Sequence, residues 1–334
     1  MSLKSTLLII FLISFLISIV ISTLFTTTQK EKIFEVKKGQ SAFEVLNNLE
    51  QQKIIPKNIF MKPVFLLFSD LKAGYYYIEK NETLYNLIKK LTKGTEYEIN
   101  ITIPEGKTIK EIEDIANAKF KEIVEKYNIE KIELKLSNLK ASDFKDEFSF
   151  LDDAESLEGF LFPDTYKIPF GIDEKNFVRI MLKNFEKKAT PVYENYKENL
   201  KGKDIKDLYN VLKIASILEK EVKNKEDKKI VAGILWKRIE NNMLLQVDAT
   251  LNYILEEKKP ALSGKDLEID SPYNTYKYKG LPPTPIANPG IESIEAALNP
   301  IESDYWFYLT TKDGKTIFSK TFEEHKQNKF KFLR

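Results

Sequence analysis

The sequence has no cysteine and only one histidine, His325, among its 334 residues. The lack of cysteine excludes disulfides, thiol nucleophiles and thiolate metal sites, and one imidazole cannot build a zinc site of two or three histidines. An excess of one charge is also lacking, because 52 Lys and Arg oppose 50 Asp and Glu. This balance argues against a nucleic-acid partner. Acid–base chemistry near neutral pH is therefore left to carboxylates, tyrosines or His325.

What is present is enough apolar material for a folded protein. Hydrophobic residues make up 43% of the chain, and the length suggests about two domains at ~100–200 residues each. The chain is thus predicted to be neither disordered nor wholly embedded in a membrane.

The run from Leu7 to Phe25 contains no charge, proline or glycine. A hydrocarbon core of ~30 Å needs about 20 such residues in a helix, so this run can span a membrane, with residues 1–6 as a short cytoplasmic tail. The alternative is a cleaved signal peptide, but the run exceeds the usual ~7–15 apolar residues and no A-x-A-like site follows. We expect an uncleaved anchor. Lys4 before the run and Lys30 and Lys32 after it leave the orientation undecided.

Three stretches, 36–46, 78–88 and 103–113, share one pattern: a short strand, a turn residue, a helix cap and an amphipathic helix. The turn residues are Gly39, Asn81 and Gly106, and the caps are Ser41, Thr83 and Thr108. Glycine and asparagine tolerate positive φ, and Ser and Thr cap helices. Such a unit resembles the LysM module, a small fold that binds cell-wall glycan, although strand–turn–helix units are common and these could bind nothing. A small α/β domain is predicted at 33–98.

Residues 110–150 are rich in Lys and Glu and have a helical period, which predicts solvated helices that link to a second domain. Beyond them, 207–222 places apolar residues along one face of a helix that should be central in the fold, followed by a second helix at 228–239. Glu219 lies on the apolar seam of the first helix and Glu221 on its opposite margin.

A carboxyl group held against apolar neighbours has a raised pKa, and a carboxylic acid that is still protonated near neutral pH is what cleavage of a glycosidic bond requires. Periodicity does not choose between Glu219 and Glu221. The alternative is a surface helix on which each glutamate pairs with a lysine.

Three other segments are dense in polar and aromatic side chains that suit sugar binding. Residues 157–166 combine aromatics with Glu158, and 271–290 is a proline-fixed loop that includes Tyr273 and Asn274. In 246–250 an extended strand would aim Gln246, Asp248 and Thr250 at one face. For the proline loop, ordinary turn chemistry is the alternative.

The C-terminal region predicts a buried strand at 305–310, a turn at 312–315 and a returning strand at 316–319. His325 follows on a short polar helix, and a structural role is expected for it. A Ser-His-Asp hydrolase would depend wholly on this residue and is not expected.

Seven segments occur here in the same order as in the endolytic murein transglycosylase family (MltG, formerly YceG), which the chain resembles from the anchor to the C-terminus. They are LEGFLFPDTY, ILEKEV, LQVDATLNY, SPYNTY, GLPPTPIANPG, AALNP and FSKTFEEH, all within 155–328. The resemblance implies an α+β fold with a single transmembrane helix, a LysM-like domain and, within 99–334, a catalytic domain outside the cytoplasm on the periplasmic side of the plasma membrane. Peptidoglycan strands and peptidoglycan synthases are the implied partners, with no metal or cofactor.

The resemblance also assigns roles to residues. The family's catalytic glutamate, taken as the first in its I-x-E-K-E segment, falls on Glu219. The substrate-binding candidates are Glu158, Gln246, Asp248, Thr250, Tyr273 and Asn274. Val247 and Ala249 depart from the family's Q-S-D-P-T motif, and a strand would point them away from the site. Thr316 stands where many relatives have histidine. A residue at this position is therefore less expected to take part in the reaction.

The implied reaction is lytic. Glu219 would protonate the oxygen between N-acetylmuramic acid and N-acetylglucosamine, and the muramic acid C6 hydroxyl would then attack C1 to leave a 1,6-anhydro end. Because water does not attack, the second carboxylate of a hydrolase is not required. The alternatives are a muramidase-type hydrolase and a non-catalytic scaffold that binds the wall and recruits synthases.

Overall fold

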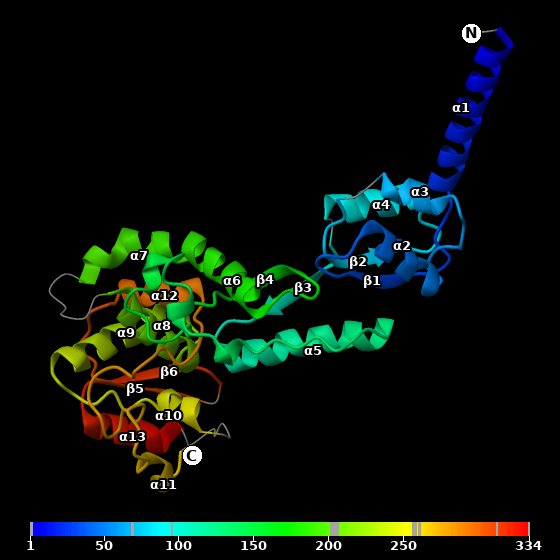
Figure 1. Cartoon of the computed structure of the whole chain (residues 1–334). Coiled ribbons are helices and arrows are strands. Elements are labelled where there is room, and N and C mark those ends of the chain that lie inside the picture. The colour runs from blue at the N-terminus through cyan, green and yellow to red at the C-terminus, as the bar shows by residue number, and fades with distance from the viewer. Residues whose placement is uncertain are drawn as a thin grey trace. The chain divides into compact units, whose positions relative to one another are not determined.

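The structure is a computed structural model that describes residues 3–67, 70–94, 96–200, 207–255, 259, 262–311 and 313–332. Residues 1–2 of the tail predicted at 1–6 and Lys312 of the predicted hairpin turn lie outside the described residues. The fold is mixed α+β with small sheets, and the chain forms two compact units (Figure 1). Unit 1 comprises residues 1–101, 117–133 and 166–172, and unit 2 comprises 102–116, 134–165 and 173–334.

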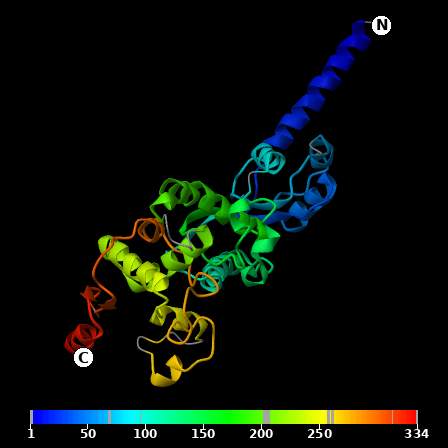
Figure 2. The ribbon, with the colours of Figure 1, turned by 90° about the vertical axis from the view of Figure 1, so that its left-hand side faces the viewer.

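Unit 1 begins with one long apolar helix. This helix, α1 (Leu3–Leu24), is the one described helix that is long and apolar enough to cross a membrane, with a mean hydropathy of 2.9. It projects from the rest of unit 1 as a single rod (Figure 2). The other elements of unit 1 are β1 (Lys32–Val36), α2 (Ala42–Gln51), α3 (Met61–Leu66), β2 (Gly74–Ile78) and α4 (Leu84–Lys93).

The first two predicted strand–turn–helix units form this small domain. Strand β1 pairs with β2 in antiparallel register from Lys32–Ile78 to Val36–Gly74. Gly39 and Asn81 take positive φ at 84° and 65°, where the chain turns from each strand towards its helix. Ser41 caps α2 in a reciprocal capping box with Glu44, and Thr83 caps α4. The strands and helices enclose an apolar core that includes Phe34, Leu49, Phe65, Tyr76 and Leu87.

The segment that follows α1 is hydrogen-bonded into the small domain. The backbone N–H of Thr28 donates to Glu82 O over 2.8 Å, and the N–H of Gln29 donates to Ile54 O over 2.7 Å. The N–H of Leu84 donates to Thr26 O over 2.8 Å. Val20 and Leu24, on the last turns of α1, pack against the apolar core. Therefore α1 and the small domain are joined without a slack linker.

Three elements contribute residues to both units: β3 (Glu98–Ile103), α5 (Ile109–Tyr127) and β4 (Asp164–Pro169), of which β3 and β4 pair. The third predicted unit is present here, with Gly106 at a φ of 71° and a reciprocal pair of hydrogen bonds between Thr108 and Glu111 at the start of α5. The prediction of solvated helices up to residue 150 is wrong beyond α5. That part forms short 3₁₀ turns, because Leu136, Phe144 and other apolar side chains are buried there.

Unit 2 is built around α8 (Leu208–Glu221), as predicted for the apolar helix. Side chains on almost every face of α8 are buried, and α12 packs against both α8 and α9. The other elements of unit 2 are α6 (Glu174–Lys188), α7 (Thr190–Tyr196), α9 (Lys225–Glu240), α10 (Asp248–Ile254), α11 (Gly264–Leu267), α12 (Ile291–Leu298), β5 (Phe307–Thr310), β6 (Thr316–Ser319) and α13 (Phe322–Phe332), with 3₁₀ turns at Leu136–Asn138, Ala141–Asp143, Ser149–Leu151 and Lys197–Leu200.

Gly233 of α9 permits one close approach in this core. A Cβ at this position would lie 2.1 Å from the backbone oxygen of Ile301, so only glycine fits. The predicted C-terminal hairpin is present, with β5 and β6 paired in antiparallel register from Phe307–Ser319 to Thr310–Thr316.

Two local predictions in unit 2 need correction. Helix α9 starts three residues earlier than predicted, because the side chain of Asn224 caps it by accepting from the N–H groups of Glu226 and Asp227. The segment 246–250 is not an extended strand. Gln246 has a φ of 54°, which breaks the extended backbone, and α10 begins at Asp248.

Candidate active site

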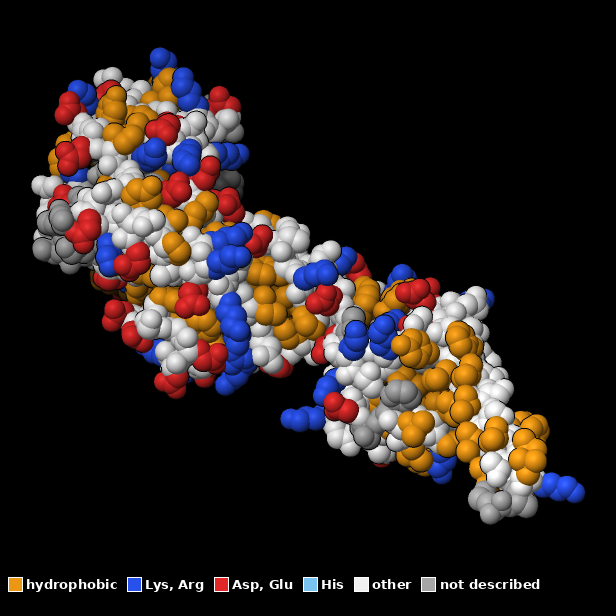
Figure 3. Space-filling model, turned by 90° about the horizontal axis from the view of Figure 1, so that it is seen from above, with side chains coloured by type: hydrophobic (Ala, Val, Ile, Leu, Met, Phe, Trp, Pro, Cys, Tyr) orange, Lys and Arg blue, Asp and Glu red, His pale blue; other side chains and the backbone are white. Residues whose placement is uncertain are grey.

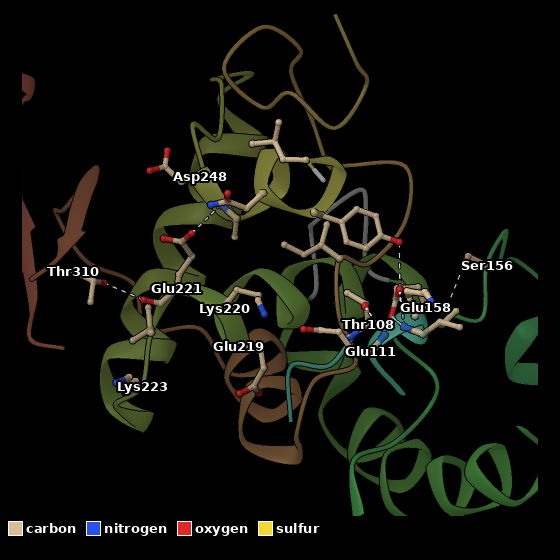
Figure 4. Close-up of a pocket in the computed structure, with 18 of the residues that line it drawn as sticks. Thr108, Glu111, Ser156, Glu158, Glu219, Lys220, Glu221, Lys223, Asp248 and Thr310 are labelled. Carbon is tan, nitrogen blue, oxygen red and sulfur yellow. Dashed lines mark hydrogen bonds between the residues drawn. The ribbon is translucent and has the colours of Figure 1, made fainter. Parts of the chain in front are cut away.

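A cleft of about 890 Å³ opens in unit 2 at the C-terminal turn of α8. Its lining comes from the end of α8, the first turns of α5 and α10, the segment around Glu158 and the β5–β6 hairpin. The charged residues of the lining are Lys110, Glu111, Glu158, Glu219, Lys220, Glu221, Lys223 and Asp248. All of them except Lys110 are labelled in Figure 4. Five carboxyl groups around one cleft make it the candidate site for acid–base chemistry.

Glu221, the last residue of α8, has the environment expected of a general acid. Removal of its carboxyl group from water and the negative charge of Asp248 raise its pKa to about 7, against the lowering effect of a hydrogen bond from Ala249. That bond joins Ala249 N to Glu221 Oε1 over 3.2 Å, so the first turn of α10 holds the carboxyl group in place. A large fraction of Glu221 is therefore protonated at neutral pH, next to open space in the cleft.

Glu219 lies two residues earlier on α8, and its carboxylate is already bound. Ser293 Oγ donates to Glu219 Oε2 over 2.6 Å, and the backbone N–H of Gly290 donates to the same oxygen over 3.1 Å. Lys228 Nζ lies 3.5 Å from this oxygen, with side-chain exposures of only 5% for Lys228 and 10% for Glu219. Glu219 points towards α12, away from Asp248 (Figure 4), and it connects α8 to the start of α12.

Asp248 is the first residue of α10, and it is the charged neighbour of Glu221. Tyr276 Oη donates a hydrogen bond to Asp248 Oδ1 over 2.5 Å, and both burial and this interaction raise the pKa of Tyr276 above its usual value. The charge of Asp248 also raises the pKa of Glu221.

Glu158 provides a second carboxyl group with a raised pKa in the lining. The residue is 2% exposed, and burial raises its pKa to about 8. It accepts hydrogen bonds from Asn288 Nδ2 over 2.7 Å, Tyr253 Oη over 3.2 Å and the backbone N–H of Ile109 over 3.2 Å. Asn288 Oδ1 in turn accepts from the N–H groups of Gly159 and Leu161. The proline loop and the 157–166 segment are therefore locked together around Glu158.

Comparison with known proteins places this chain. A sequence model of the YceG-like family matches residues 34–331. The chain is 35% identical over 270 residues to the endolytic murein transglycosylase of Bacillus subtilis (strain 168), across 79% of this chain and 74% of that protein. The chain belongs to the YceG-like family.

Further YceG-like proteins cover more of this chain. The endolytic murein transglycosylase of Streptococcus pneumoniae (strain D39) is 28% identical over 317 residues, which are 88% of this chain but 57% of that longer protein. A crystal structure of a yceG-like protein from Listeria monocytogenes superposes with a TM-score of 0.56 at 30% identity, and it covers 90% of this chain and all of the other. The similarity of this YceG-like chain thus extends over both units.

In this YceG-like chain the predicted site residues divide into two groups. Glu158, Glu219 and Asp248 line the cleft together with Glu221. The other four predicted residues lie outside the lining, and they are Gln246, Thr250, Tyr273 and Asn274. Ala249, which was expected to point away from the site, lines the cleft and holds Glu221 through its N–H.

The residues outside the lining stabilise its supporting loops. Thr250 Oγ1 is buried and donates to Val247 O, and Asn274 Nδ2 donates to Leu267 O and Ile269 O. The hydroxyl groups of Tyr273 and Thr284 are hydrogen-bonded across the proline loop. Gln246 is exposed, at the positive-φ bend before α10. These residues stabilise the loops that support the cleft and do not line the cleft itself.

Sequence reasoning missed the groups that act through hydrogen bonds on the cleft carboxylates, namely Tyr253, Tyr276 and Asn288. A signal was available for Tyr253, because a helix that began at Asp248 would have placed Tyr253 one turn after Ala249 on the same face. His325 and Thr316 lie outside the lining. His325 stacks on Phe307 at 5.4 Å, and burial lowers its pKa to about 4. Among the described residues, no group of three His, Asp or Glu side chains is arranged to hold a metal ion.

Proposed function

We propose that this chain is an endolytic murein transglycosylase, a lyase that cuts the β-1,4 bond between N-acetylmuramic acid and N-acetylglucosamine within nascent peptidoglycan strands. Cleavage would leave 1,6-anhydro-N-acetylmuramic acid ends and so terminate or trim the strands. The names of the B. subtilis and S. pneumoniae relatives support this activity. The single observation that supports the chemistry is a carboxyl group of pKa about 7, that of Glu221, at an open cleft.

The general acid in this proposal is Glu221, in place of the Glu219 favoured by the sequence. An acid must carry a proton near neutral pH and must reach the substrate. Glu221 meets the first requirement through burial and the charge of Asp248. The Oε2 atom of Glu219 accepts two hydrogen bonds and lies 3.5 Å from Lys228 Nζ, so this carboxylate holds α8 to the start of α12.

The reaction needs one proton, which is donated and recovered. Protonated Glu221 donates to the glycosidic oxygen as the bond between this oxygen and the muramic acid C1 breaks. The N-acetyl group and the carboxylate of Asp248 stabilise the positive charge that develops at C1. The Glu221 carboxylate then takes the proton of the C6 hydroxyl as O6 attacks C1. The products are an anhydro-ended strand and a strand with a free C4 hydroxyl, and no water is consumed.

Glu158 and Tyr253 support substrate binding at the other part of the lining. Glu158, whose pKa burial raises to about 8, would hold this wall of the cleft in place through the hydrogen bonds that it accepts from Asn288, Tyr253 and Ile109. Tyr253 presents a ring at the cleft wall and packs against Tyr273 at 5.3 Å. An aromatic ring beside hydrogen-bonding groups suits the apolar face and polar rim of a pyranose.

The same proposal places the chain at the plasma membrane. Helix α1 would be a single-pass anchor, with residues 26–334 on the outer, periplasmic side, where peptidoglycan is assembled. The small domain would act as a LysM-like module on the glycan, for which the paired strand–turn–helix units are the support. Peptidoglycan synthases are the expected protein partners.

Product chemistry tests the proposal. Nascent peptidoglycan is treated with the full-length chain, with Glu221→Gln and, as the matched control on the same helix, with Glu219→Gln, and the released glycan is analysed by mass spectrometry. We expect anhydro ends from the wild type, a loss of ~10²–10⁴ in rate for Glu221→Gln, and retained chemistry for folded Glu219→Gln.

Other outcomes would replace parts of the proposal. Reducing ends would make the protein a muramidase-type hydrolase. No cleavage by folded protein would leave a non-catalytic wall-binding scaffold. Loss of activity in folded Glu219→Gln with full activity in Glu221→Gln would return the acid to Glu219.

A further inference from the structure

Unit 1 exposes a group of large apolar side chains around α3, here called the α3 patch. Its members and their exposed fractions are Phe43 at 38%, Ile59 at 81%, Phe60 at 42%, Leu66 at 57% and Leu67 at 70%. They surround a helix whose other face is buried in the apolar core through Met61, Val64 and Phe65. A helix on the surface of a soluble domain normally presents polar residues to water, so this helix, apolar on both faces, calls for a covering surface.

The position of the α3 patch relative to α1 indicates what covers it. Helices α1 and α3 are in contact, and Val20 and Leu24 pack against the same core that buries the inner face of α3. At 1.5 Å per residue, the 22 residues of α1 extend about 33 Å. This length barely exceeds the ~30 Å of hydrocarbon that an anchor must cross. The bilayer surface therefore falls near the last turns of α1, which are the turns that touch the small domain.

The apolar surface is continuous between the two elements. In Figure 3 hydrophobic side chains run from the apolar helix onto the adjoining surface of the small domain. Lys57 and Lys62 lie in the same stretch of chain as the patch residues Ile59 and Phe60, and both lysines are exposed. Lys62 Nζ lies 4.2 Å from the ring centroid of Phe43, so its charge sits at the edge of the apolar surface. Apolar side chains bordered by lysines are the composition of surfaces that lie in a lipid interface.

We infer that the α3 patch is a second membrane contact, which inserts into the outer lipid interface beside α1 and seats the small domain on the bilayer. The inference rests on the proposed anchoring by α1. The apolar side chains enter the boundary between headgroups and acyl chains, and the lysines reach the phosphate groups of anionic lipids. The small domain is thereby held in one orientation on the membrane, and its α3 side is withdrawn from water.

Site-directed spin labelling tests this inference, and the absence of cysteine makes every introduced label unique. Single cysteines replace Ile59, Leu67, Ile13 and Lys38 in the full-length chain, which is reconstituted into vesicles of phosphatidylcholine and phosphatidylglycerol. Ile59 and Leu67 are mostly exposed, so substitution removes little packing. Ile13 lies mid-way along α1 and reports on the anchor, and Lys38 lies in the polar turn after β1 and reports on water.

We expect the Ile59→Cys and Leu67→Cys labels to be relaxed more strongly by oxygen, which concentrates in lipid, than by a water-soluble nickel chelate. The Lys38→Cys label should show the opposite order. A lipid signal from Ile13→Cys with aqueous signals from both patch labels would overturn the inference and leave the anchor standing. An aqueous signal from Ile13→Cys as well would remove the anchor itself.

A second copy of the chain is the competing occupant of the patch. If it covered the patch, the Ile59→Cys and Leu67→Cys spectra would show spin–spin broadening that disappears on dilution with unlabelled protein. That result would overturn the assignment to lipid. Spectra unchanged by dilution, together with preferential relaxation by oxygen, support it.

Discussion

The two units of this protein bury very different groups. Among the described residues, the core of the small domain is apolar, and its caps lie at the surface. Unit 2 buries a set of charged and amide side chains that includes Glu113, Glu158, Lys228, Arg238, Asp266, Asn274 and Asn288. Burial of a polar group costs free energy unless partners satisfy it. Such groups are concentrated in the unit that holds the cleft, where they fix loops and set the pKa values of carboxyl groups.

This contrast predicts how each unit responds to mutation. In unit 2 the largest effects should come from loss of one member of a buried polar set, because its partners are left unsatisfied. In the small domain they should come from lost apolar volume.

The largest expected loss of stability follows from Glu219→Gln. The change removes a charge from a buried pair and leaves Lys228 without its counter-ion, which costs about 3–5 kcal/mol in such settings. Chemical denaturation of unit 2 measures this loss. Ser293→Ala is the matched control, because it removes one hydrogen bond to Glu219 and should cost about 1 kcal/mol. Equal stabilities of Glu219→Gln and the wild type would show that the contacts of Glu219 with the start of α12 do not stabilise the fold.

Leu87→Ala should destabilise the small domain by about 3 kcal/mol, because Leu87 is fully buried in its core and a cavity would remain. Amide hydrogen exchange read by mass spectrometry should show faster exchange in β1, β2 and α4, with α8 and α12 unchanged. Tyr85→Ala on the same helix is the control, since Tyr85 is 50% exposed and should change stability by no more than about 0.5 kcal/mol. Exchange that rises equally in α8 would contradict the independence of the two cores.

The pH dependence of cleavage sharpens the role of Glu221. The acid must be protonated, so kcat/KM should fall as pH rises above about 7, by roughly tenfold per unit and about 100-fold at pH 9. Asp248→Asn removes the negative charge that raises this pKa, so the alkaline fall should begin at lower pH, whatever happens to the maximal rate. If the midpoint of the alkaline fall does not move in Asp248→Asn, the charge of Asp248 does not raise the pKa of the catalytic acid.

The smallest effect is expected from Ser41→Ala, which removes the capping box of α2 and should cost about 1 kcal/mol in the small domain. Thermal unfolding with and without the substitution measures it, and Ser41→Gly should lose only a few tenths of a kcal/mol. A loss of several kcal/mol would show that the cap does more than satisfy the first turn of the helix.

Local signals in the sequence were sufficient for the elements that local chemistry determines. Gly39, Asn81 and Gly106 indicated the three turns, and the apolar period of 207–222 indicated the central helix. These predictions succeed because a positive φ, a cap or an amphipathic face depends on residues a few positions apart.

The cleft depends on contacts between distant segments, and there the sequence was insufficient. Periodicity showed that Glu219 and Glu221 face different sides of α8. It could not show that the start of α12, some seventy residues later, would bind Glu219. The strand predicted at 246–250 failed for a local reason, because the left-handed bend at Gln246 has no glycine to reveal it.

The hydrogen bonds that fasten residues 26–29 to the small domain have a mechanical consequence. Because residues 26–29 are hydrogen-bonded to the small domain, the segment between α1 and β1 does not provide a hinge. The small domain therefore does not rotate independently of α1. Rotation or tilt of α1 in a bilayer would therefore also rotate or tilt the small domain. If α1 spans a membrane as proposed, the length of α1 sets the distance of the small domain from the bilayer.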